Sequence, residues 1–324
     1  MNREQVGWRS LYPYDSHYLA LGSQQASGGA QVRLHYIDEG PRGGAPELAP
    51  HQPNSDRSDK SGVQHQASSI LCVHGNPTWS FYYRSIVDRF SATNRVVAVD
   101  HIGCGMSDKP PQYAYTLQQH TDNLVALIDA IDLQRIVMVV HDWGGAIGLG
   151  AALRRLDRMA GLVVLNTGAF PPPYVPLRIA ACRLPWIGSF AMRHLNAFAR
   201  AATVMAIDRL PRLDTNVRDG LLAPYDTAAH RVGIDGFVKD IPMSKTHPTF
   251  ATLKKLESDL PKLGRLPIRL VWGMKDWCFT PECLRRFKVA WPNASVRELS
   301  DVGHYVMEEA ASEVCEELAG LVIQ

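Results

Sequence analysis

One aspartate in this chain stands where an enzyme would place a nucleophile. Asp142 follows the β-branched run 135–140 and precedes the small-residue run 144–148, a pattern typical of a buried strand that turns sharply into a helix. The tip of such a turn usually carries serine, whereas a carboxylate there would attack carbon and form an ester with its substrate. A helix N-cap is the alternative interpretation, but a cap requires neither the small residues nor a histidine partner.

Two further residues follow later strands in the order that a catalytic triad of this type requires. Asp276 comes after the apolar run 268–273, and His304 lies in a Gly-His turn after the last predicted strand. With Asp142 they give the order nucleophile, acid and base. In this arrangement His304 activates water, and Asp276 orients the His304 imidazole. Asp276 could instead be a simple turn residue. The other position open to an acid holds Asn166, which cannot ionise, and this favours Asp276.

Two hydrogen-bond donors accompany the predicted nucleophile. Asn76 follows a His-Gly turn, and Trp143 follows Asp142 directly, so their backbone amides match the pair that forms an oxyanion hole. The Trp143 indole donates and does not accept, and the Asn76 amide can donate as well. Two side-chain donors beside a carboxylate predict that an anionic leaving group is held in an apolar pocket. Packing of Trp143 in the core is the alternative interpretation.

The elements that must position these residues alternate along the chain. Apolar runs separated by helical stretches predict an α/β fold, in which a mostly parallel central sheet is covered by helices on both faces. The predicted strands are 17–22, 31–38, 70–73, 96–99, 135–140, 162–165, 268–273 and 295–299, with helices over 116–131 and 305–322.

The sheet pattern is interrupted twice. Residues 41–69 almost lack large apolar side chains, which predicts a mobile loop insertion. Residues 168–243 contain helical stretches without a strand pattern. They predict a helical cap over the carboxyl ends of the strands, where ligands of such sheets bind. We therefore expect a core made of 1–167 and 244–324, with the cap inserted between its two parts.

Composition and charge argue against several classes of function. The 324 residues include 34 basic and 32 acidic side chains, and a net charge of +2 gives no reason to expect nucleic acid or an anionic membrane as partner. No apolar run is long enough to span a membrane. The N-terminal residues lack the apolar core of a signal peptide, and the six scattered cysteines form no metal-binding pair. We expect free thiols in the cytoplasm, and neither a cofactor nor a metal.

Three segments resemble motifs of the haloalkane dehalogenase family of α/β-hydrolases. They read HGNPTWS at 74–80, DHIGCGMSD at 100–108 and HDWGG at 141–145, and the similarity covers most of the chain. The resemblance implies the α/β-hydrolase fold with an inserted helical cap, and hydrolytic dehalogenation of haloalkanes through a covalent alkyl ester. The roles implied are Asp142 as nucleophile, His304 as base, Asp276 as acid, and Asn76 with Trp143 as halide donors.

The motif set is similar to the third dehalogenase subfamily, which includes β-lactone decarboxylases of bacterial long-chain olefin synthesis. NTGAFP at 166–171, NAFAR at 196–200 and APYD at 223–226 resemble that branch. The alternative function is therefore decarboxylation of a cis-3,4-dialkyl β-lactone to an alkene. The resemblance also implies a small apolar substrate, a bound halide ion, and a homo-oligomer or an assembly with olefin-pathway enzymes. Epoxide hydrolysis is a third alternative, for which Tyr174 and Tyr225 could supply the acid.

Overall fold

The computed structural model describes residues 7–22, 31–41 and 68–322. Most of the predicted insertion 41–69 lies outside these residues. Its last residue, Ser69, already belongs to a strand, so the predicted loop extends one residue too far. Within the described residues no helix is long and apolar enough to cross a membrane.

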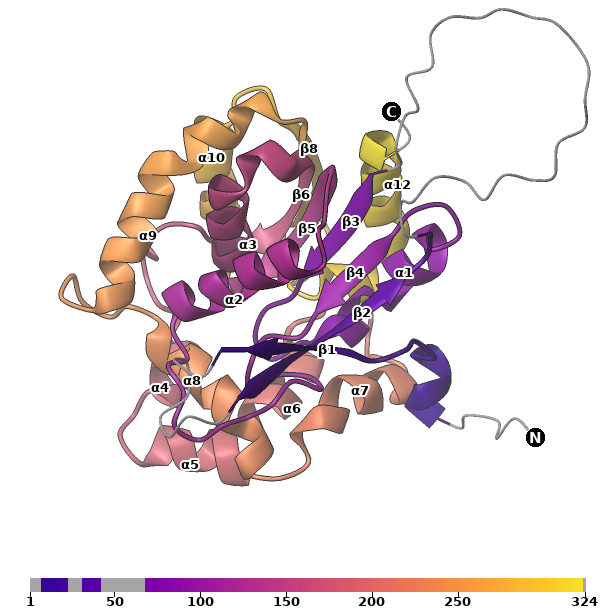
Figure 1. Cartoon of the computed structure of the whole chain (residues 1–324). Coiled ribbons are helices and arrows are strands. Elements are labelled where there is room, and N and C mark those ends of the chain that lie inside the picture. Colours follow the sequence, from indigo (N-terminus) through magenta and orange to yellow (C-terminus); the bar gives the residue numbers. More distant parts are fainter. Residues whose placement is uncertain (1–6, 23–30, 42–67, 323–324) are drawn as a thin grey trace, which may run out of the picture.

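All eight predicted strands are present and form one sheet (Figure 1). They are β1 (His17–Leu21), β2 (Val32–Glu39), β3 (Ser69–Val73), β4 (Val96–Val99), β5 (Ile136–Asp142), β6 (Met159–Thr167), β7 (Ile268–Gly273) and β8 (Ser295–Leu299). Their order across the sheet is β1-β2-β4-β3-β5-β6-β7-β8, and only the pairs of β2 with β1 and β4 are antiparallel. The sheet is therefore mostly parallel, as the sequence pattern predicts.

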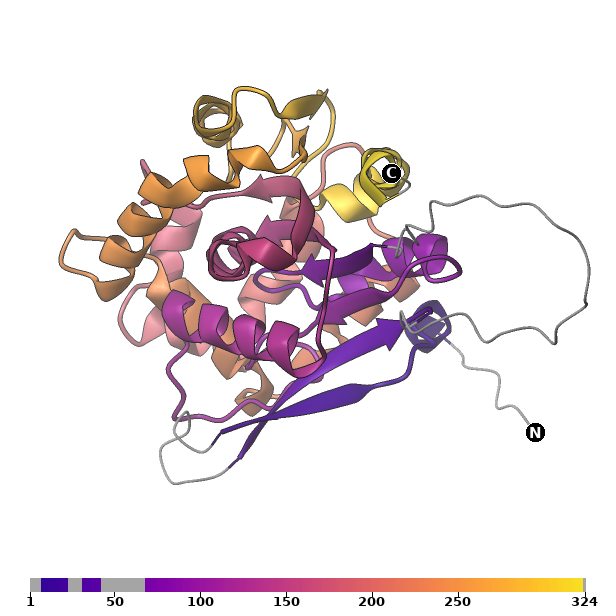
Figure 2. The same cartoon turned by 45° about the horizontal axis from the view of Figure 1, so that its top comes forward.

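Helices cover both faces of this sheet. The helices of one face are α2 (Leu117–Ala130), α3 (Trp143–Arg154), α9 (Pro248–Asp259) and α10 (Pro281–Ala290), and those of the other are α1 (Arg84–Phe90) and α12 (Ala311–Val322). Figure 2 shows α3 and α12 nearly end-on, on opposite sides of the strands.

Strand β5, which carries the predicted nucleophile, is buried along its whole length. Ile136, Met138 and Val140 belong to the apolar cluster on one face, and Val137 and Val139 belong to the cluster on the other. Successive side chains of a strand point to opposite faces. A strand between two helical layers must therefore be apolar at every position, which accounts for the unbroken β-branched run.

Between β6 and α9 the chain leaves the sheet and forms five α-helices. They are α4 (Leu177–Cys182), α5 (Ile187–His194), α6 (Ala197–Met205), α7 (Thr215–Leu222) and α8 (Val232–Asp240). All residues from 168 to 243 are described, and none of them is in a strand. In Figure 1 these helices form the lower part of the molecule.

The C-terminal helix predicted over 305–322 is wrong in one respect, because the structure has two helices there, α11 (Val306–Glu309) and α12. The break falls at Ala310, whose backbone is not helical. The Glu309 carboxylate is buried and accepts the backbone N–H groups of Gly303 at 2.6 Å and Asp208 at 2.7 Å. The first bond ties Glu309 to the loop before α11, and the second ties it to the segment after α6, so the end of α11 is fixed where the helix breaks.

Candidate active site

The turn between β5 and α3 holds Asp142 in a conformation that few residues adopt. Its φ is +52° and its ψ is −129°, and the surrounding backbone approaches closely. A Cβ added at Gly144 would lie 2.1 Å from the carbonyl oxygen of Val73, and one at Gly145 would lie 1.8 Å from Oγ1 of Thr167. The small residues after Asp142 are therefore required by the tight turn, and a strained backbone of this kind is typical of functional sites.

The Asp142 side chain does not act as a helix cap. It forms no capping hydrogen bond within α3. Instead its Oδ1 accepts the backbone N–H of Asn76 at 2.6 Å. Gly75 makes this approach feasible, because a Cβ there would lie 2.0 Å from the same oxygen. The alternative interpretation of Asp142 as an N-cap therefore does not describe this turn.

The structure brings the three predicted triad residues together at the carboxyl ends of β5, β7 and β8. Nδ1 of His304 donates to Oδ2 of Asp276 at 2.8 Å, and Nε2 of His304 lies 3.7 Å from Oδ2 of Asp142. All three residues are at least nine-tenths buried. The imidazole thus lies between two carboxylates, with one nitrogen directed at each.

The Asp276 carboxylate is held by its own loop and by the neighbouring strand. Its Oδ1 accepts the backbone N–H groups of Cys278 at 2.7 Å and Phe279 at 3.1 Å. Asn166, at the end of β6, accepts from Gly273 N–H at 2.7 Å and donates to the Gly273 carbonyl at 2.9 Å. Asn166 therefore fixes the end of β7, from which the Asp276 loop departs. It occupies the other position at which the sequence allowed an acid.

Burial and charge shift the ionisation of the triad. Burial raises the pKa of Asp142, and this outweighs the lowering effects of His304 and of the backbone amides of Trp143 and Asn76. Burial lowers the pKa of His304, but the charges of Asp276 and Asp142 outweigh it, so the net pKa lies above its ordinary value. A less solvated carboxylate is a better nucleophile, and a histidine of raised pKa is a stronger base.

We expect the Asp276→Asn variant to move the acid limb of the pH–rate profile to lower pH. If His304 is the base it must be neutral, so the step that needs it slows as the pH falls through the raised pKa of His304. Removing the adjacent charge lowers that pKa, by an amount on the order of one unit for a close ion pair. The rate of ester hydrolysis should also fall roughly 10²- to 10⁴-fold, because the imidazole loses its orienting carboxylate.

The measurement is the rate against pH for both proteins, with Asp301→Asn as the control. Asp301 precedes His304 by three positions and pairs at the surface with Arg209, so its loss should leave the profile in place. An unshifted acid limb in Asp276→Asn would show that Asp276 does not set the ionisation of the base.

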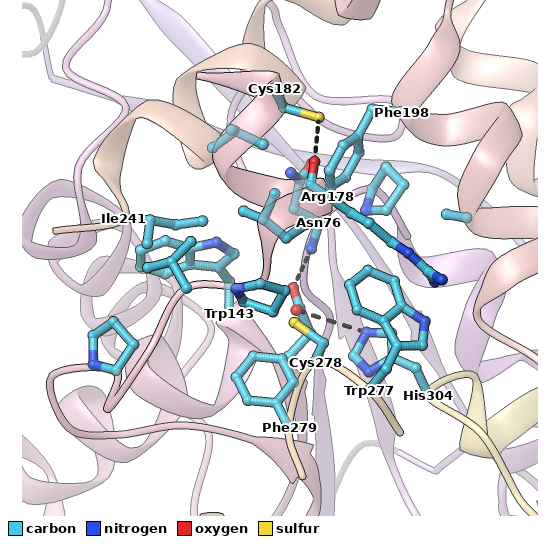
Figure 3. A pocket seen from close by; sticks show the side chains of 18 of the residues that line it. Asn76, Trp143, Arg178, Cys182, Phe198, Ile241, Trp277, Cys278, Phe279 and His304 are labelled. Atoms are coloured by element: carbon cyan, nitrogen blue, oxygen red, sulfur yellow. Dashed lines mark hydrogen bonds and ion pairs between the residues drawn. The ribbon is translucent and has the colours of Figure 1, made fainter. Parts of the chain in front are cut away.

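The two predicted side-chain donors line the same pocket as His304 (Figure 3). Asn76 Nδ2 donates to the carbonyl of Ile234 at 3.3 Å, which fixes the orientation of the amide. The second hydrogen of the same NH2 group can still be donated to a ligand. The indole N–H of Trp143 forms no hydrogen bond with any residue that the structure describes, although its ring packs against Phe237 at 5.7 Å. By contrast, the indole N–H of Trp277 in the same pocket donates to a backbone carbonyl.

A cavity of about 410 Å³ adjoins Asp142. Its polar end is formed by Asn76, Asp142, Trp143 and His304, and most of its remaining wall is apolar. Much of that wall comes from the helices between β6 and β7, including Ile179, Met192, Phe198 and Val238. An apolar cavity with a few convergent polar groups is the usual form of a small-molecule site.

Neither tyrosine considered for epoxide opening fits that role. Tyr225 does not line the cavity, and its hydroxyl donates to the Thr78 carbonyl at 3.3 Å. Tyr174 lines the cavity but is half exposed, and its hydroxyl donates to the Trp277 carbonyl at 3.4 Å. With both hydroxyls bound to backbone, the arrangement disfavours epoxide hydrolysis.

Two supporting residues were not identified from the sequence. The Thr167 hydroxyl donates to the Asp142 carbonyl and so fixes the strained turn. Nε2 of His141 donates to the His304 carbonyl at 2.9 Å, and burial lowers the pKa of His141 well below its usual range, so this ring stays neutral. Each lies beside a residue that the sequence did single out. That adjacency is the only signal that could have found them.

Comparisons with known proteins agree with this fold. Residues 68–311 match the model of the family described as alpha/beta hydrolase fold. A cis-3-alkyl-4-alkyloxetan-2-one decarboxylase from Shewanella oneidensis is 35% identical over 311 residues, covering 94% of this chain and 87% of that protein. A haloalkane dehalogenase from Mycolicibacterium paratuberculosis is 31% identical, covering 82% of this chain and 78% of the relative.

A solved structure of a haloalkane dehalogenase has the same fold. The tetrameric haloalkane dehalogenase DpaA from Paraglaciecola agarilytica superimposes with a TM-score of 0.73 and 26% identity, covering 97% of this chain and 95% of that chain. Fold, sequence and structural neighbours thus agree. The chain belongs to the α/β-hydrolase fold family, in the branch of enzymes that contains the haloalkane dehalogenases and the cis-3-alkyl-4-alkyloxetan-2-one decarboxylases.

Proposed function

We propose that Asp142 displaces an anionic leaving group from an alkyl carbon and forms a covalent ester with it. The observation that carries this proposal is the arrangement around the Asp142 carboxylate. The His304 imidazole lies 3.7 Å away, and the unpaired indole N–H of Trp143 lines the same end of an apolar cavity. Asn76 and Trp143 would hold the departing anion. This chemistry needs neither a cofactor nor a metal.

With a haloalkane, the ester would be hydrolysed in a second step. Asp142 attacks the carbon that carries the halogen, the carbon–halogen bond breaks, and the halide remains on the two donors. His304, oriented by Asp276, then removes a proton from water, which attacks the ester carbonyl and restores the carboxylate. The products are an alcohol, a halide ion and a proton.

With a cis-3,4-dialkyl β-lactone, the same first step leads to a different end. Asp142 attacks the ring carbon bonded to oxygen, and the C–O bond breaks to leave a carboxylate on the neighbouring carbon. Loss of carbon dioxide from that carboxylate supplies the electron pair of the new C=C bond and expels Asp142. No water is consumed. We propose the β-lactone as the natural substrate, because the relatives of higher identity, at 35% and 34%, carry that activity in their names.

Parallel assays of a cis-3,4-dialkyl β-lactone and a panel of 1-bromoalkanes test the proposal. We expect alkene and carbon dioxide from the lactone with a kcat/KM above that of any bromide, and bromide release from the panel as a second activity. Both should disappear in Asp142→Asn. Hydrolysis of the lactone to a β-hydroxy acid, or a bromide that reacts faster than the lactone, would overturn the assignment of the natural substrate.

We expect Trp143→Phe to weaken halide binding roughly 10- to 100-fold, because a hydrogen bond to a charged group contributes about 1.5–3 kcal/mol. Titration calorimetry with bromide gives the dissociation constant. Trp277→Phe is the matched control, since that ring also lines the cavity but its N–H is already bound to the Met205 carbonyl. Equal losses in the two variants would mean that the Trp143 N–H is not a halide ligand.

Further parts of the proposal concern the setting of the enzyme. We propose that 168–243 acts as a cap that closes over the substrate, since its helices supply much of the cavity wall. All six cysteines are free thiols, which suits a reducing cytoplasm. A homo-oligomer is consistent with the tetrameric neighbour. Assembly with enzymes of olefin synthesis would follow if the lactone is the natural substrate.

A further inference from the structure

The helices next to the cavity carry an unusual distribution of charge. Between Gly168 and Ile207 the sequence contains no aspartate and no glutamate, but it contains four arginines, at positions 178, 183, 193 and 200. The whole chain is nearly balanced, with 34 basic and 32 acidic side chains. This segment is therefore a local region of positive charge that the net charge of the protein does not reveal.

The same segment exposes most of the large apolar side chains that reach solvent. Of the eleven such residues among those that the structure describes, eight lie between positions 170 and 205. Trp186 is 90% exposed, Leu177 88% and Phe190 56%. We call the exposed arginines and large apolar side chains of α4, α5, α6 and the turns that join them the cap surface. It consists of Leu177, Arg178, Leu184, Trp186, Ile187, Phe190, Leu195, Arg200 and Val204.

The positive charge of the cap surface is not neutralised by neighbouring carboxylates. Arg178 and Arg200 form no ion pair with any described residue, and the Arg178 guanidinium lies over the Trp277 ring at 5.2 Å. The carboxylate nearest α5 in the hydrogen-bond network, Asp235, is already bound by Lys239 at 2.7 Å. The surface therefore combines free cations with exposed aromatic and aliphatic groups.

The cap surface is continuous with the mouth of the cavity. Arg178 and Ile187 are exposed, and both also line the cavity. Figure 3 shows Arg178 and Trp277 in the cavity wall with Trp143 and His304. In Figure 1, α4 and α5 lie in the lower part of the molecule, on the side of the cap that faces away from the sheet. A flat partner could thus cover the mouth without contacting the sheet or its helices.

We propose that the cap surface docks reversibly on an anionic lipid surface, so that the cavity opens toward the phase in which long-chain apolar substrates dissolve. Trp186 and Phe190 would enter the interfacial region, where aromatic rings are favoured. Arg178 and Arg200 would face lipid phosphates, and each basic group near such a surface adds to the attraction. A second copy of the chain suits this surface less well, because a two-fold contact would bring arginines against arginines.

Vesicle sedimentation tests the docking without any need for turnover. The full chain is mixed with phosphatidylcholine vesicles that contain either no anionic lipid or about one quarter phosphatidylglycerol, in low salt and in 0.5 M salt. We expect at least a fivefold greater bound fraction on anionic vesicles, and release in high salt because the charges are exposed. Trp186→Ser combined with Phe190→Ser should lose at least fivefold in binding, and Arg200→Gln should reduce the preference for anionic lipid, with Arg178 supplying the remainder.

Val289→Ser is the matched control, because Val289 is 80% exposed on α10, away from the cap. It should bind vesicles as the unchanged protein does. Circular dichroism and bromide release from a short, water-soluble bromoalkane show whether each variant is folded and active, so a failure of the proposed reaction is distinguishable from a failure of docking. Equal binding to neutral and anionic vesicles, or no loss in the double variant, overturns the proposal. The proposal is also overturned if the unchanged protein self-associates and the double variant does not, since a second copy of the chain would then cover the cap surface.

Discussion

A His304→Ala protein incubated with a 1-bromoalkane should gain the mass of one alkyl group on Asp142 and release one equivalent of bromide. Formation of the ester requires only the carboxylate and the halide donors. Hydrolysis of the ester requires a base, and His304 is the imidazole that lies 3.7 Å from Asp142. Loss of a positioned base lowers such a step roughly 10²- to 10⁴-fold, so the ester should persist long enough for intact-mass and peptide analysis.

The same variant separates the two substrate classes. Release of the alkene from a lactone-derived ester consumes no water, so His304→Ala should still turn over the β-lactone while it stalls on the bromoalkane. Asp142→Asn combined with His304→Ala is the control and should gain no mass. Multiple turnovers of bromoalkane by His304→Ala, or a label on any residue other than Asp142, would contradict the assigned roles.

Asp142→Asn should remove turnover of both substrates by a factor of roughly 10⁴ or more, and it should also raise the melting temperature at neutral pH. Burial raises the pKa of Asp142, so the folded state disfavours the charged form relative to the unfolded chain. That destabilisation is present above the folded-state pKa and vanishes below the unfolded value near 3.8. A neutral amide of similar shape removes it. The gain should therefore be largest near pH 7 and disappear at acid pH.

Asp100→Asn is the matched control for this effect, because Asp100 is also a buried aspartate but its pKa shifts in the other direction. Burial raises its pKa, yet the bonds from His35 and Met106 outweigh burial and hold the net pKa below its usual value. Ionised Asp100 therefore stabilises the fold above its unfolded pKa, and Asp100→Asn should lower the melting temperature at pH 7. A fall in both variants would show that any change in a buried aspartate destabilises this core.

Some features of this protein were determined by its sequence alone. The central strands could be located because a strand between two helical layers needs apolar side chains at every position, as Ile136 to Val140 show. The first two strands could be located from alternating polarity, since each has one partly exposed face. The three triad residues could be named because each lies at the end of a predicted strand or in the loop after it, and the carboxyl ends of parallel strands lie along one edge of a sheet. The least accurate prediction was the end of the chain, where the buried Glu309 carboxylate breaks one expected helix into two.

Other features were decided only by the tertiary structure. The hydrogen bonds of Asn166, Thr167 and His141 join them to residues that are distant in sequence, and no local pattern encodes such contacts. The free indole N–H of Trp143 is distinguished from the bound one of Trp277 only by which carbonyls the fold places nearby. The basic and apolar cap surface was hidden by a net charge of +2, because composition averages over the whole chain while a surface depends on which side chains the fold leaves exposed.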